Sequence, residues 1–321
     1  MMLALGAYLN LQHEISAGVM IAASIMLGCA LAPIEQVIGQ WPIVLRTRVA
    51  WKTLDKFLLA TPAVAPLTKL PRPRAILDIE RASLAQPGAK ELSLRSIDFR
   101  LEAGQILGAI GQSASGKSSL ARMLAGIWRP TSGHVRLDGA TLDQFGGDDL
   151  GRHIGYLPQD VTLFSATISE NIARLSPDAN SADIIAAAKM AGAHEMILQL
   201  SEGYNTYVSA PGGSLSGGQK QRVGLARTLY LDPVILILDE PSSNLDNAET
   251  ISRNTTIRAI KSNGGSVVIM THRLAALVEC DLVLILEHGS VKAFGSRDHV
   301  LKTAVRNYTQ LSNEMQSVAN N

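Results

Sequence analysis

The residues at 111–118 read GQSASGKS, a composition suited to wrapping the phosphates of a nucleotide. Glycines allow backbone amides to turn inward on an anion, and a helix that begins inside such a loop adds the partial positive charge of its N-terminus. An apolar run precedes the loop and a helical pattern follows it, which distinguishes it from a chance glycine-rich turn. We expect Lys117 to reach the outer phosphates and the Ser118 hydroxyl to ligate Mg²⁺. The residues expected to bind nucleotide are Gly111, Gln112, Ser113, Ala114, Ser115, Gly116, Lys117, Ser118 and Ser119.

Two carboxylates follow the apolar run VILIL at 234–238. Such a run predicts a strand buried on both faces of a largely parallel sheet, and ligands of open α/β sheets bind where the strands end. A surface cap is the common alternative for an Asp-Glu pair, but the phosphate loop favours a catalytic role. We expect Asp239 to hold Mg²⁺, through water, and Glu240 to polarise the water that attacks the phosphate.

A second glycine-rich segment, LSGGQ at 215–219, opens another helical run. A helix N-terminus preceded by small residues is an anion site, but a helix in the same chain as the phosphate loop need not reach the same nucleotide. Taken alone, this segment would be a common glycine cap.

Together with three further segments, this run resembles the signature of ATPases of the ABC transporter family. The segments are GYLPQD, which contains Gln159, SSNLD at 242–246, and VVIMTHR, which contains His272. The resemblance implies that Gln159 senses Mg²⁺ and water, and that His272 hydrogen-bonds the γ-phosphate and helps to hold Glu240 and the water in line. It also implies a head-to-tail dimer in which one short segment closes on ATP held by the partner's phosphate loop; its residues are Ser216, Gly217, Gly218 and Gln219.

The chain departs from the family pattern at two places, and five histidines lack supporting motifs. The family usually has an aromatic residue that stacks on adenine before the turn proline of the first hairpin, where this chain has Gln86. Upstream of the signature, Ser209 and Ala210 replace a common Gly-Glu pair. We therefore expect weak base stacking and altered coupling between subunits. The histidines without such surroundings are His134, His153, His194, His288 and His299.

The N-terminal sequence predicts membrane segments. Residues 15–34 are uncharged and long enough to cross about 30 Å of hydrocarbon as a helix, with apolar character all round rather than along one stripe. A buried soluble helix is the alternative, and a signal peptide is disfavoured because no basic region precedes the run. The basic flank that follows places the C-terminal side in the cytosol; it contains Arg46, Arg48, Lys52 and Lys56. Residues 1–11 are expected to form the outer half of a preceding span, so that the sequence begins inside a longer membrane domain.

Composition limits the other functional classes. The 321 residues carry 29 Lys and Arg against 28 Asp and Glu, a net charge of +1, which argues against a nucleic-acid partner. The two cysteines do not form a disulfide framework pattern, which is consistent with a reducing compartment for most of the chain.

We therefore predict an α/β P-loop nucleotide-binding domain of the ABC type, preceded by a membrane-spanning helix and a helical stalk. The expected boundaries are a partial membrane domain at 1–60 with one full span at about 15–37, a proline-rich linker at 61–75, the ATPase domain at 76–302 and a tail at 303–321.

The resemblance implies ATP hydrolysis coupled to export, and the stretch LPQDVTLFSATISENIAR at 157–174 is similar to type I protein secretion ATPases. It implies ATP and Mg²⁺ as cofactors, and an inner-membrane location with a cytoplasmic ATPase domain. The implied partners are a second copy or a related half-transporter, a membrane-fusion protein, an outer-membrane channel and a secreted protein. The alternatives left open are a lipid or drug exporter half, and a truncated nucleotide-binding remnant that regulates a full-length partner. A soluble chromosome-maintenance ATPase is disfavoured by the predicted span.

Overall fold

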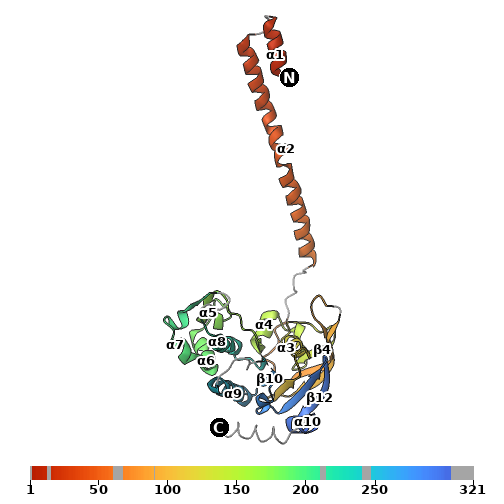
Figure 1. Cartoon of the computed structure of the whole chain (residues 1–321), viewed down its shortest axis with the longest axis vertical. Coiled ribbons are helices and arrows are strands. Elements are labelled where there is room, and N and C mark those ends of the chain that lie inside the picture. Colours follow the sequence, from red (N-terminus) through yellow and green to blue (C-terminus); the bar gives the residue numbers. More distant parts are fainter. Residues whose placement is uncertain are drawn as a thin grey trace. The chain divides into compact units, whose positions relative to one another are not determined.

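The computed structural model describes residues 2–12, 16–60, 68–89, 91–209, 215–240 and 247–304. The chain divides into two compact units, Met1–Pro66 and Leu67–Asn321, which are drawn in Figure 1. The expected switch segment at 242–246, Ala210, and the tail beyond Ala304 lie outside the described residues.

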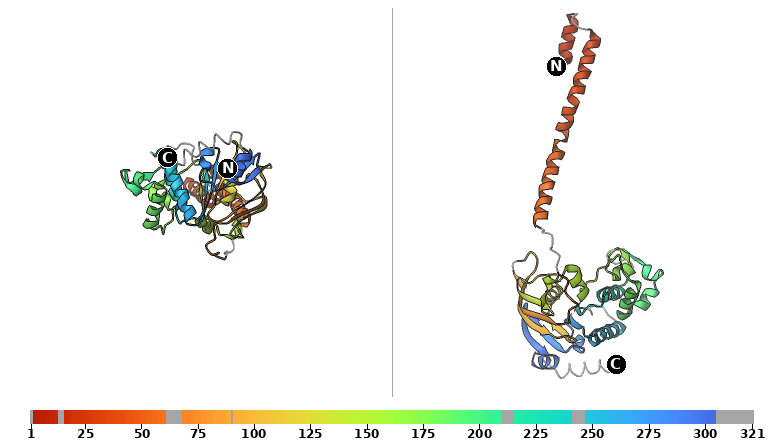
Figure 2. Two further views of the ribbon diagram at one scale, coloured as in Figure 1. Left: turned by 90° about the horizontal axis from the view of Figure 1, so that it is seen from below. Right: turned by 180° about the vertical axis from the view of Figure 1, so that it is seen from behind.

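The N-terminal unit consists of two helices, α1 (Met2–Leu11) and α2 (Ala17–Ala60). They lie side by side at their connected ends (Figures 1 and 2), where a Cβ on Gly6 would come within 2.5 Å of the Met20 side chain. Among the described residues, one helix is long and apolar enough to cross a membrane, Ala17–Leu59. Helix α2 has 44 residues and contains Pro33 and Pro42, so the span and stalk expected from the sequence form one element. At about 1.5 Å per residue it is roughly 66 Å long, about twice the thickness of a hydrocarbon core.

The second unit is built around a six-stranded sheet with the order β12-β11-β3-β10-β9-β6. Neighbouring strands from β11 to β6 pair in parallel, and β12 pairs antiparallel with β11. The strand bounds are β3 Ile106–Ile110, β6 Ile154–Leu157, β9 Ile235–Asp239, β10 Ser266–Thr271, β11 Leu282–Glu287 and β12 Ser290–Ser296. The structure thus has the expected α/β sheet, and the run at 282–291 belongs to two antiparallel strands joined at His288 and Gly289.

Alternate residues of these strands enter two different cores. Ile106 and Ile110 pack in one apolar cluster, whereas Leu107 and Ala109 pack in the other. Every residue of β3, β9 and β10 is buried. Burial on both faces explains why these strands are continuously apolar rather than alternating.

A separate antiparallel sheet has the order β2-β1-β4-β5. Its strands are β1 Leu77–Ala85, β2 Leu92–Leu101, β4 Ser132–Leu137 and β5 Ala140–Thr141. The sequence analysis predicted a largely parallel sheet and did not predict this second sheet. Their alternating burial, with one face on the core, is the feature that separates them from the parallel strands.

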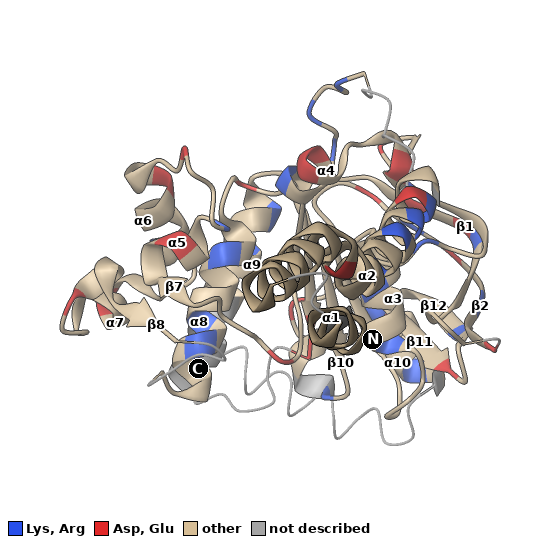
Figure 3. Cartoon of the chain, turned by 90° about the horizontal axis from the view of Figure 1, so that it is seen from above, with Lys and Arg blue, Asp and Glu red and all other residues tan. Residues whose placement is uncertain are grey.

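The helices lie around the two sheets, and α5 to α8 gather on one side of the unit (Figures 1 and 2). Their bounds are α3 Lys117–Leu124, α4 Gly147–His153, α5 Ile168–Ile172, α6 Ser181–Met190, α7 His194–Leu198, α8 Gly217–Leu229, α9 Asn247–Ser262 and α10 Arg297–Ala304. The short strands β7 (Ala166–Thr167) and β8 (Tyr207–Val208) pair beside α5. Acidic and basic residues are intermixed over this unit (Figure 3), as the net charge of +1 suggests.

Candidate nucleotide site

The loop between β3 and α3 has the geometry of a phosphate cradle. Helix α3 begins at Lys117, and Gly116 before it has a φ of 105°, which a residue with a side chain rarely adopts. A Cβ on Gly116 would lie 3.1 Å from the Ser93 carbonyl oxygen, and one on Gly111 would lie 2.5 Å from the Leu286 carbonyl oxygen. Both glycines are therefore required by conformation or space, and the first amides of α3 open onto the loop.

Lys117 is held inside this loop with only 5% of its surface exposed. Its Nζ donates to the carbonyl oxygens of Gly111 at 2.8 Å and Gln112 at 2.9 Å. The same nitrogen lies 3.8 Å from Glu240 Oε1. The lysine charge is thus directed at the centre of the loop.

Asp239 ends the buried strand β9, and it meets the first turn of α3. The Ser118 hydroxyl donates to Asp239 Oδ1 at 3.3 Å, so the two residues expected to hold Mg²⁺ are in contact. Burial raises the pKa of Asp239, and the charge of Glu240 raises it further, while the hydrogen bond from Ser118 opposes these effects. The Tyr156 hydroxyl donates to Asp239 Oδ2 at 3.4 Å, and burial followed by the charge of Asp239 raises the pKa of Tyr156 to about 12.

Glu240 and His272 follow adjacent parallel strands, β9 and β10, and they face one another. His272 Nδ1 lies 3.4 Å from Glu240 Oε1, and the Glu240 amide donates to the Met270 carbonyl at 2.9 Å. Glu240 has a φ of 48°, a conformation that is uncommon for residues other than glycine and often marks functional positions. Half of the His272 side chain is exposed, so the imidazole is accessible to a ligand.

Part of this arrangement borders a pocket of ≈ 530 Å³, although Asp239 and His272 are not among the described residues that line it. The expected residues Lys117, Ser118, Gln159 and Glu240 line it, together with Gln86. Serine and aspartate oxygens, with places left for substrate phosphates and water, are a donor set that Mg²⁺ uses in nucleotide sites. Among the described residues, no group of three or more His, Cys, Asp or Glu could hold a metal without a substrate.

Two further residues in the pocket wall, Arg122 and His288, were not predicted from the sequence. His288 lacked a supporting motif, but it is in the β11–β12 turn, whose position at the end of a parallel strand is the signal that could have identified it. Arg122 is on α3, one turn beyond the phosphate loop, and stacks on the Trp128 ring at 4.7 Å. In place of an aromatic ring, Gln86 presents an amide whose Nε2 lies 3.5 Å from the Ser119 hydroxyl.

The other glycine-rich segment is not part of this pocket. Ser216 caps α8, where its hydroxyl accepts from the Gln219 amide at 3.2 Å and its own amide donates to Gln219 Oε1 at 2.8 Å. A Cβ on Gly217 would meet no atom of the described residues within 4 Å, so this helix end is open within the part of the chain that the structure describes. Among the described residues that line the pocket, none comes from 216–219.

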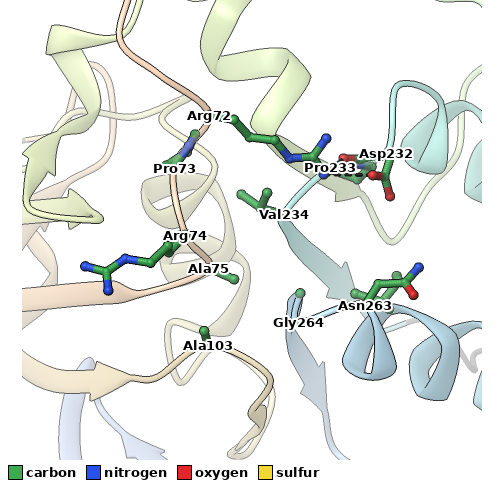
Figure 4. A pocket seen from close by; sticks show the side chains of 12 residues that line it. Arg72, Pro73, Arg74, Ala75, Ala103, Asp232, Pro233, Val234, Asn263 and Gly264 are labelled. Carbon is green, nitrogen blue, oxygen red and sulfur yellow. Dashed lines mark hydrogen bonds and ion pairs between the residues drawn. The ribbon is translucent and has the colours of Figure 1, made fainter.

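A second hollow, of ≈ 250 Å³, is lined by the segment before β1 and by the turns after α8 and α9. Figure 4 shows Arg72 extending toward Asp232 there, and its Nη2 donates to Asp232 Oδ2 at 2.7 Å. The two side chains are 57% and 66% exposed. None of the residues expected to bind nucleotide is among the described residues lining this hollow.

Comparison with known proteins finds similar sequences and a similar structure. Residues 94–243 match the ABC transporter family. The chain is 47% identical over 305 residues to a type I secretion system ATP-binding protein of Rhizobium meliloti, covering 95% of this chain and 52% of that protein. It is 35% identical over 300 residues to a cyclolysin secretion/processing ATP-binding protein of Bordetella pertussis, covering 92% of this chain and 42% of that protein.

A solved structure of a bacterial Atm1-family ABC exporter with ATP bound superposes with a TM-score of 0.80 at 27% identity, over 94% of this chain and 53% of that chain. The chain thus spans about half the length of the relatives that it matches.

Proposed function

The chain carries the ATPase domain of the ABC transporter family, and from this premise we propose that it hydrolyses ATP to drive export across a membrane. The observation that supports the proposal most strongly is that Lys117 and His272 both lie close to the Glu240 carboxylate, at 3.8 Å and 3.4 Å, and that Lys117 and Glu240 line one pocket beside the phosphate loop. Phosphoryl transfer needs positioning and charge stabilisation more than covalent chemistry, and these three groups supply both.

Each group has a separate role in this proposal. The amides at the start of α3 and the Lys117 ammonium bind the phosphates and stabilise negative charge that shifts to the leaving group. The Glu240 carboxylate orients a water in line with the γ-phosphate and accepts its proton. His272 donates to a γ-phosphate oxygen and restrains Glu240. Mg²⁺, when bound, would neutralise phosphate charge, and Ser118 and Asp239 would hold it, with Gln159 at its edge.

We also propose that the site is completed by a second copy or by a related half-transporter. At the start of α8, Ser216 and Gly217 are exposed and Gly218 is half-buried, and none of the three is among the described residues lining the pocket of their own chain. An ATP molecule bound by the partner's phosphate loop would meet this end through the exposed amides and the helix dipole. Gln219 would keep its capping role in this arrangement.

For the transported molecule we propose a protein, secreted by a type I system with a membrane-fusion protein and an outer-membrane channel. The support is the similarity to secretion ATP-binding proteins of two organisms. The proposed location is the inner membrane, with helix α2 spanning it and the ATPase domain in the cytoplasm. A lipid or drug exporter half and a regulatory nucleotide-binding remnant are the competing proposals.

The substitution Glu240→Gln tests hydrolysis. The amide keeps the shape of the side chain but loses the charge that orients water, so turnover should fall by at least about 100-fold while ATP still binds. The measurements are phosphate release and equilibrium binding of a fluorescent ATP analogue. Turnover at the parental rate would refute the role of Glu240.

Transport is tested separately by expressing the 321-residue chain in a strain that lacks related exporters, with the envelope components and a secreted protein. Helices α1 and α2, even doubled in a dimer, are too few to enclose a polypeptide, whose polar backbone costs several kcal/mol per group in lipid. We expect ATP hydrolysis without secretion until a partner supplies further spans. Secretion that depends on hydrolysis by this chain alone would contradict the expectation.

A further inference from the structure

Arg174, in the turn after α5, places a charged side chain among backbone carbonyl groups. Its Nε donates to the carbonyl oxygen of Arg227 at 3.0 Å, and its Nη2 donates to those of Thr228 at 3.1 Å and Tyr230 at 3.4 Å. Its Nη1 donates to the Gly151 carbonyl oxygen in the last turn of α4. One guanidinium therefore binds two helix ends at once.

The carbonyls of Arg227 and Thr228 belong to the last turn of α8, where carbonyl groups have no amide donor within the helix. Unpaired carbonyls at a helix C-terminus carry a partial negative charge that a cation stabilises. Burial lowers the pKa of Arg174 and the nearby charge of Arg227 lowers it further, but a guanidinium stays protonated at neutral pH. Arg174 thus acts as a charged cap for α8, provided by the turn after α5.

The backbone around Arg174 is itself fixed. Arg174 and Leu175 have φ values of 56° and 60°, and the Leu175 amide donates to the Glu170 carbonyl at 2.8 Å. Asn171, fully buried on α5, accepts from the Phe164 amide at 2.8 Å and donates to the Thr167 carbonyl at 3.0 Å. Helix α5, which lies against α8 (Figure 1), therefore joins the loop that follows Gln159 to the end of α8.

The end of α8 also packs tightly on the strand that leads to Gln159. A Cβ on Gly155 in β6 would lie 2.6 Å from the Thr228 carbonyl oxygen. Little space is left there for the helix to shift, and the hydrogen bonds from Arg174 set its direction. The C-terminal end of α8 is the fixed end, whereas the open end at Gly217 faces outward.

We propose that Arg174 is a positioning residue for ATP hydrolysis, which fixes the C-terminal turn of α8 so that Ser216, Gly217 and Gly218 at its other end meet the ATP held by the partner subunit. This inference rests on the proposed composite site. Helix α8 has 13 residues and is about 20 Å long, so a tilt of about 10° at its fixed end displaces the open end by about 3 Å. A displacement of that size is as long as a hydrogen bond and breaks contact with a phosphate.

The test compares Arg174→Ala with the parental 321-residue chain in detergent micelles. Turnover at saturating ATP should fall by at least about tenfold, because the partner's signature no longer meets the nucleotide. The dissociation constant for fluorescent ATP, measured in the Glu240→Gln background, should stay within about twofold, since Arg174 does not line the nucleotide pocket. The matched control is Arg152→Ala, which removes an exposed arginine one residue from Gly151 and should change neither quantity.

A purely structural role is separated by measuring turnover per folded molecule. If Arg174→Ala does not fold, Arg174→Lys is used instead, because its ammonium keeps the charge but cannot reach all four carbonyls. In this variant turnover should fall about threefold or more, and ATP binding should be preserved. Parental turnover per folded molecule in the Lys variant, or an equal loss of binding and turnover in either variant, would overturn the inference. An inactive parental chain would overturn the proposed function as well, whereas an active parental chain with an equally active Arg174→Ala variant would overturn the inference alone.

Discussion

The beginnings of α3 and α8 are two glycine-rich helix ends of the same chain with opposite surroundings. At α3 the end is enclosed: Lys117 is buried, and Asp239 and Glu240 are close to its first turn. At α8 the end is open, and a side chain added at Gly217 would have its Cβ more than 4 Å from every atom of the described residues. Both ends can bind an anion through helix amides, but the side chains proposed to be catalytic surround only the first. In the proposed composite site, the two ends are halves of one site rather than two sites.

The largest effect on ATP binding and turnover is expected from a substitution at the enclosed end of α3. Lys117→Ala removes a buried cation that contacts phosphate, and hydrogen bonds to charged groups contribute about 1.5–3 kcal/mol, so ATP binding should weaken by at least about tenfold. Turnover should fall by at least about 1,000-fold, because the same charge stabilises the transition state. Fluorescent ATP binding and phosphate release measure the two losses. Unchanged binding would show that the phosphates are held elsewhere.

A substitution at the open end of α8 should reduce turnover without weakening ATP binding. Gly217→Glu places a negative charge and a side chain where the partner's phosphates are expected, so turnover should fall by roughly 100-fold. ATP binding to the chain's own pocket should change by less than about twofold, because residue 217 does not line it. Gly217→Ala is the conservative control and should retain most of the turnover. Equal losses of ATP binding and turnover in the Gly217→Glu variant would show that the two helix ends do not have separate roles.

A smaller effect, on nucleotide affinity alone, is expected from a substitution of Gln86 in the wall of the enclosed pocket. With Gln86 in place of an aromatic ring, GTP should compete nearly as well as ATP. Gln86→Tyr should tighten ATP binding by about tenfold, since stacking on a base contributes about 1–3 kcal/mol in nucleic-acid complexes. Competition between ATP and GTP in parental and variant chains measures this. A hundredfold preference for ATP in the parental chain would mean that another residue recognises adenine.

The smallest effect on stability and turnover is expected from breaking the ion pair between Arg72 and Asp232, beyond the C-terminal end of α8. Both side chains are more than half exposed. A double-mutant cycle of Arg72→Ala and Asp232→Asn should give a coupling free energy of about 0.2–1 kcal/mol, and turnover should stay at the parental rate. Thermal or denaturant unfolding supplies the free energies. A coupling of several kcal/mol would mean that this segment holds α8 as firmly as Arg174 does.

The sequence predicted the parts of the site that have local patterns. Gly111 and Gly116 could be predicted because their loop must turn sharply, and Asp239 and Glu240 because a continuously apolar strand precedes them. Arg174 and His288 could not, because their roles depend on contacts between elements far apart in sequence: carbonyls at 151 and 227–230 for Arg174, and the pairing of β11 with β3 for His288. The separate antiparallel sheet was missed for the same reason, since register between distant strands leaves no local signal.

The pairing of one chain's phosphate loop with another chain's α8 is the central claim, and a thiol cross-link tests it most directly. One chain carries Ser113→Cys and the other Gly217→Cys, both in the Glu240→Gln background with Cys29 and Cys280 replaced by serine. Because Ser113 lines the pocket and Gly217 is open, mild oxidation should yield a covalent dimer of the two chains only when ATP is present. A yield that ATP does not change, or no cross-linked dimer at all, would contradict the composite site.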